Sequence, residues 1–86
     1  MVSGKTKSGF EFKLDNDAMN DMELLEDLGK LDSGDVLIIP RILERILGED
    51  KSALYDHVRT ESGRVPIDAL VTELKSIFES SKELKN

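Results

Sequence analysis

Apolar residues recur with the period of a helix over the second half of the chain. Residues 35–48 have the spacing i, i+3, i+4, i+7, i+8, which predicts a helix that begins near Asp35, is distorted at Pro40 and is closed by a glycine. Residues 49–59 begin with acidic residues and end with an arginine, which favours a further helix. The most regular apolar stripe predicts a last helix over residues 66–79, because a proline suits the first helical turn.

The first half of the chain shows two different periods. Residues 10–14 alternate between apolar and polar, which predicts a short strand whose partner is residues 5–7, joined through a turn at Ser8 and Gly9. Apolar residues then follow at spacings of three after three capping residues, which predicts a helix over residues 17–28 that ends near Gly29.

These patterns predict a mostly α fold: a compact bundle of about four helices with a short N-terminal β-strand or hairpin. We expect residues 1–86 to form a single domain, because 86 residues are enough for one small domain only. Residues 1–9 are small, polar and basic, and we expect them to form a flexible arm. Residues 80–86 hold one apolar residue, and we expect them to form a frayed tail.

Composition narrows the class of protein. The chain has 12 basic and 18 acidic residues, so its formal net charge is −6, which argues against binding to nucleic acid. It contains no cysteine, which removes disulfides, thiolate nucleophiles and cysteine-based zinc sites. The longest apolar run, residues 36–39, is far shorter than the roughly 20 residues that span a bilayer. We therefore expect an intracellular protein that binds no membrane.

The sequence offers little catalytic chemistry. His57 is the only histidine, and Ser52 and Asp56 are not placed by a helix to form a triad with it. No glycine-rich phosphate-binding motif is present. A calcium loop starting at Asp15 would need a side-chain oxygen at Met19 and a glycine one residue later, so these acidic residues are better read as helix caps. We predict that the protein is not an enzyme and needs neither a metal nor another cofactor.

Five apolar residues exceed the needs of one small core. Leu24 falls off the main apolar face of its predicted helix. Leu37 and Ile38 cannot both point inward with the residues that follow them, because successive helix residues are about 100° apart. Phe10 and Phe12 lie on an edge strand. Two interpretations stay open: these residues pack on the core, or they form a partner-binding or self-association surface. Serine at positions 37 and 38 should then weaken binding and leave the fold intact.

The first half of the chain also contains an acidic segment. Residues 15–35 contain eight acidic residues and one base, Lys30. Such a face is typical of a surface that keeps a protein soluble, and it could also dock a basic segment of a partner.

Several short stretches, read in order, carry a resemblance to a known family. Over residues 8–79 the chain resembles the small tail assembly chaperones of long-tailed phages and prophages of Gram-positive bacteria. The most telling stretches are FEF at 10–12, DMEL at 21–24, LGE at 47–49, YDHVR at 55–59 and GRVP at 63–66.

The resemblance implies a chaperone that binds the tape measure protein, keeps it soluble and promotes polymerisation of the tail tube around it. In this family a frameshift can add a second domain that recruits the tail tube protein, and the present chain would correspond to the short product. Self-association, action in the host bacterial cytoplasm and absence from the mature virion are also implied. The alternatives are a structural connector or completion protein retained in the virion, and a small nucleic-acid-binding regulator.

Overall fold

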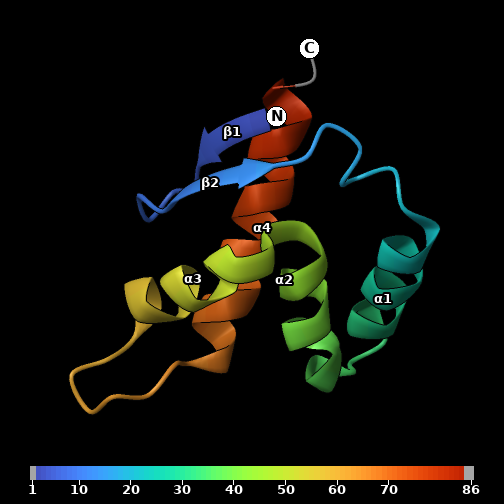
Figure 1. Ribbon diagram of the computed structural model, residues 1–86. Helices are drawn as coiled ribbons and strands as arrows, with labels where there is room; N and C mark the ends of the chain where they lie inside the picture. Colours follow the sequence, from blue (N-terminus) through green and yellow to red (C-terminus); the bar gives the residue numbers. More distant parts are fainter. Residues whose placement is uncertain (1, 85–86) are drawn as a thin grey trace.

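The computed structural model describes residues 2–84, with side chains through residue 80. The chain is mostly helical and begins with a two-stranded antiparallel hairpin, as predicted (Figure 1). The elements, in chain order, are β1 (Val2–Lys5), β2 (Glu11–Leu14), α1 (Met22–Asp32), the 3-10 turn η1 (Val36–Ile38), α2 (Ile39–Leu47), the 3-10 turn η2 (Gly48–Asp50), α3 (Lys51–Val58) and α4 (Ile67–Leu84).

The prediction of about four separate helices needs correction. Within the described residues, helix is found in three continuous segments, 22–32, 36–58 and 67–84. The middle segment is continuous because η1, α2, η2 and α3 follow one another without an intervening loop. The chain changes direction between α2 and α3 at Gly48, whose φ of 57° and ψ of −124° suit a residue without a side chain.

The first helix begins later than predicted. Its N-cap is Asp21, whose carboxylate accepts a hydrogen bond from the backbone N–H of Glu23 at 2.9 Å. Residues 15–20 form turns instead, because acidic capping residues stabilise turns as well as helix starts. The helix also continues past Gly29 to Asp32, and Gly34, with φ of 103°, adopts the left-handed conformation just beyond its end.

The segment around Pro40 agrees with a start near Asp35 followed by distortion. The carboxylate of Asp35 accepts a hydrogen bond from the N–H of Leu37 at 3.2 Å and caps η1. The α-helical pattern then starts at Ile39, which places Pro40 in the first turn, where a missing N–H costs little.

The N-terminal hairpin replaces most of the predicted flexible arm. β1 pairs with β2 in a register that sets Val2 opposite Leu14 and Lys5 opposite Glu11, so residues 2–5, and not 5–7, form the partner strand. The turn between them closes through a hydrogen bond from the N–H of Thr6 to the carbonyl of Phe10 at 2.9 Å. At the other end, α4 continues to Leu84, and residues 85–86 of the predicted tail lie outside the described residues.

The core forms where the hairpin, α2 and α3 meet α4. β1 lies against α4, and the side chains of alternate β2 residues point inward, as the period of two predicted. The buried apolar residues are Phe10, Phe12, Leu14, Leu24, Ile38, Ile39, Ile42, Leu43, Ile46, Leu47, Leu54, Leu70, Leu74 and Ile77.

Two glycines provide a matched test of backbone strain. Alanine at Gly48 is expected to destabilise the protein by about 1–3 kcal/mol, because its backbone angles are unfavourable for any residue with a Cβ. Alanine at Gly29, inside α1, is expected to stabilise it by about 0.5–1 kcal/mol. A Cβ meets no atom within 4 Å at either position, so urea unfolding of both variants isolates the backbone effect. Equal changes in the free energy of unfolding at the two sites would contradict the strain assigned to Gly48.

Candidate functional site

An apolar groove of about 360 Å³ lies between α1 and α4, and η1 contributes to its lining. We call it the α1–α4 groove. Its charged lining residues are Asp32 on α1 and Lys75 on α4. The other lining residues are apolar and come from all three elements: Leu28, Leu31, Val36, Val71, Leu74 and Phe78.

On α4, the groove exists because two apolar stripes run side by side. The first stripe, residues 70, 74 and 77, is buried against the core. The second, Ile67, Val71 and Phe78, lies next to it on the helix surface and is less covered: Ile67 is 60% exposed, and Val71 and Phe78 are half-buried. The second stripe therefore extends the wall of the groove toward the beginning of α4.

The opposite wall comes from α1, which packs on α2 and η1. Leu24 and Asp27 face α2 and are buried, whereas Leu28 and Leu31 turn toward the groove and are half-buried. Leu25, one helical turn before Leu28, is 59% exposed. Both walls thus carry apolar side chains beyond those that the core covers.

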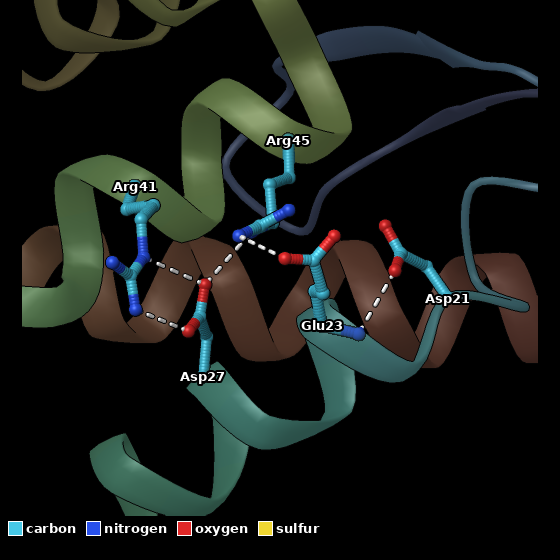
Figure 2. Close-up of polar contacts among 5 residues, drawn as sticks. All are labelled: Asp21, Glu23, Asp27, Arg41 and Arg45. Atoms are coloured by element: carbon cyan, nitrogen blue, oxygen red, sulfur yellow. Dashed lines mark hydrogen bonds and ion pairs between the residues drawn. The ribbon is translucent and has the colours of Figure 1, made fainter.

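A buried carboxylate holds α1 in this position. Asp27 is 2% exposed and accepts hydrogen bonds from Arg41 at 2.7 and 3.0 Å and from Arg45 at 2.8 Å. Figure 2 shows both arginines reaching from α2 to Asp27, with Arg45 also 3.8 Å from Glu23. Because the arginines are four residues apart, they lie on the same face of α2 and can share a single partner on α1.

These contacts change the acidity of Asp27. The hydrogen bond from Arg41 is the largest cause, and with Arg45 it lowers the pKa of Asp27 from 3.8 to about 2, although burial acts in the opposite direction. Asp27 therefore remains charged over the pH range in which most carboxyl groups begin to take up protons. Part of the acidic segment therefore binds α1 to α2 and is not a solvated face.

A second polar cluster joins the hairpin to α3 and α4, and no pattern in the sequence indicates it. Ser8 donates a hydrogen bond to Glu73 at 2.8 Å and lies 2.9 Å from Nε2 of His57. Thr6 donates to the same carboxylate at 2.9 Å, and Glu73 is 4% exposed. The hydrogen bonds from the turn to the helices join residues 49 to 67 positions apart, so no local spacing could reveal them.

This cluster resembles a nucleophile–base pair only in composition. The single proton of the Ser8 hydroxyl is donated to Glu73, so Nε2 of His57 must carry the proton of the bond between His57 and Ser8. A general base needs the reverse arrangement, with a free nitrogen facing the hydroxyl. The cluster therefore fixes the hairpin turn against the helices.

Of the five apolar residues for which core packing and a partner-binding surface both stayed open, four are buried in the core. Leu24 faces α2, Phe12 points from the hairpin into the core, and Phe10 is covered by His57, with 5.5 Å between the ring centroids. Ile38 is only 7% exposed, because the 3-10 turn η1 rotates it inward. The same turn directs Leu37 outward, and its side chain is 86% exposed.

Periodicity alone groups the apolar residues of α4 into one stripe and does not separate groove residues from core residues. The signal that could have separated them is the width of the apolar surface of α4: six large apolar residues over 67–78 form two stripes, and a small core covers one. None of the helices within residues 2–84 has the length and hydropathy that crossing a bilayer requires. Comparison with models of protein families, with curated proteins and with solved structures finds no match to this chain.

Proposed function

We propose that this protein is a phage tail assembly chaperone that holds an amphipathic helical segment of the tape measure protein in the α1–α4 groove. The structural observation that supports the proposal is an apolar groove between two helices that each carry uncovered apolar side chains. The sequence resemblance over residues 8–79 supports the choice of partner. The tail tube protein would be recruited through a longer, frameshifted form, in the host cytoplasm, and the chaperone would leave before the virion is complete.

The physical basis of binding is burial of apolar surface on both molecules. A helix placed in the groove covers Val71 and Phe78 on one side and Leu28 on the other, and each Å² of apolar surface removed from water contributes about 25 cal/mol before the entropic costs of binding. The net charge of −6 on this chain favours solubility through mutual repulsion between copies.

Co-expression with the neighbouring tape measure protein tests the proposal. We expect the tape measure protein to remain soluble and to co-purify with the wild type. Aspartate at Val71 should abolish recovery of the complex, because it places a charge in the apolar groove. Aspartate at Thr72 is the matched control: it adds the same charge at an exposed position of the same helix and should leave recovery unchanged.

Circular dichroism of both variants distinguishes loss of binding from loss of fold. An insoluble tape measure protein beside a free, folded wild-type chain would contradict the proposal. Recovery of the chain from purified virions would also contradict it and would favour a structural connector or completion protein. Equal recovery with both aspartate variants would place the binding surface outside the groove, with the exposed Leu37 as the next position to test.

A further inference from the structure

The α1–α4 groove has opposite charges on its two walls. Asp32 lines the groove from α1 and Lys75 lines it from α4, and both are exposed. Neighbouring charges are occupied, since Glu23 and Asp27 pair with arginines of α2 and Glu79 pairs with Lys7. Neither Asp32 nor Lys75 takes part in an ion pair among the residues whose side chains the structure describes.

These two charges matter because a bound helix has two flanks. A helix that rests its apolar stripe on the floor of the groove presents one flank to α1 and the other to α4. Turning the helix end for end keeps the stripe on the floor and exchanges the flanks. Apolar contact alone therefore does not distinguish the two directions, whereas Asp32 and Lys75 do.

We propose that the groove selects the direction of the helix it binds. The occupant is an amphipathic helix with Lys or Arg on the flank that faces Asp32 and Asp or Glu on the flank that faces Lys75. This inference rests on the binding of a helix in the groove proposed above and adds the charge pattern and polarity of the bound segment. Reversal brings like charges together on both walls, which lowers the population of the reversed complex.

The expected selectivity is moderate and depends on salt. Two exposed ion pairs formed in one direction, and two like-charge contacts in the other, correspond to a ratio of about tenfold between the directions at low ionic strength. Because both residues are exposed, the ratio should fall toward one as salt is added.

The test uses a synthetic helical peptide of about 20 residues, long enough to cross a small domain, with a leucine stripe, Lys on one flank and Glu on the other. A nitroxide spin label at the peptide N-terminus broadens the nearest amide signals of the isotope-labelled, full-length protein. In the wild type we expect broadening at one end of the α4 wall, near either Val71 or Phe78. In the double variant D32K/K75D, whose net charge is unchanged, we expect the broadening at the opposite end of the α4 wall.

A second exchange serves as the control. The double variant K13D/D17K exchanges the same charges at exposed positions outside the groove and should broaden the same end as the wild type. Three outcomes would overturn the inference: equal broadening at both ends in the wild type, the same end in D32K/K75D, or no peptide-induced change at the groove amides. Failure of the tape measure protein to co-purify leaves the peptide result unaffected, so the two proposals fail separately.

Discussion

Serine at Ile38 is expected to lower the free energy of unfolding by about 2–5 kcal/mol, whereas serine at Leu37 changes it by less than about 0.5 kcal/mol. Ile38 is 7% exposed and packs in the core, so a serine there leaves a cavity and buries a hydroxyl group. Leu37 is 86% exposed, so its replacement removes little buried apolar surface. Urea unfolding of the two single variants measures the difference directly.

This pair also separates two roles that the sequence could not distinguish. A stable Ile38→Ser variant would show that the side chain is not part of the core, and would return it to the list of surface residues. Destabilisation by Leu37→Ser of more than about 1 kcal/mol would show that η1 is packed differently.

Acid is expected to release α1 from α2 by protonating Asp27. The pKa of Asp27 is lowered to about 2 in the folded protein, against 3.8 as the reference value for the unfolded chain. The unfolded chain therefore binds this proton first, so the stabilisation is complete above about pH 4 and is lost as the pH falls through about 2. Thermal unfolding measured between pH 5 and pH 2 should show a melting temperature that is nearly constant down to about pH 4 and falls from there to pH 2.

Asparagine at Asp27 is expected to lower stability at pH 7 and to reduce its dependence on pH below 4. Asparagine has about the same size, but it removes the charge to which Arg41 and Arg45 donate. Glutamine at Glu26, an exposed acidic residue of the same helix, is the control and should keep the wild-type pH profile. If the melting temperature of Asp27→Asn falls below pH 4 by as much as that of the wild type, other carboxyl groups are responsible for the loss of stability in acid.

The helices and strands with a regular apolar pattern could be predicted from the sequence, for physical reasons. The apolar stripe of α4 and the alternation in β2 each reflect one face against the core, so their period reports the element directly. The start of α1 was not accessible, because Asp15, Asp17 and Asp21 are all good N-caps and local preference does not choose among them. In the folded protein Asp21 is the cap, and Asp27 in the same helix is paired with α2.

The candidate site was harder to predict than the fold. A sequence shows that apolar residues exceed one face of a helix, but it does not show which of two adjacent stripes the core covers. On α1 the answer depends on α2, which buries Leu24 and leaves Leu28 at the groove. At η1 it depends on a 3-10 geometry that exposes Leu37 and buries Ile38.

The contacts between the hairpin and α4 also determine when the core can be completed during synthesis. Thr6 bonds to Glu73, and Ser80 donates to the carbonyl of Lys5 at 3.0 Å, so the first and the last elements of the fold are partners. On the ribosome, the hairpin emerges first and its helical partner last. β1 therefore remains without its helical partner until α4 has been translated, which makes docking of the hairpin a late step in the folding of residues 2–84.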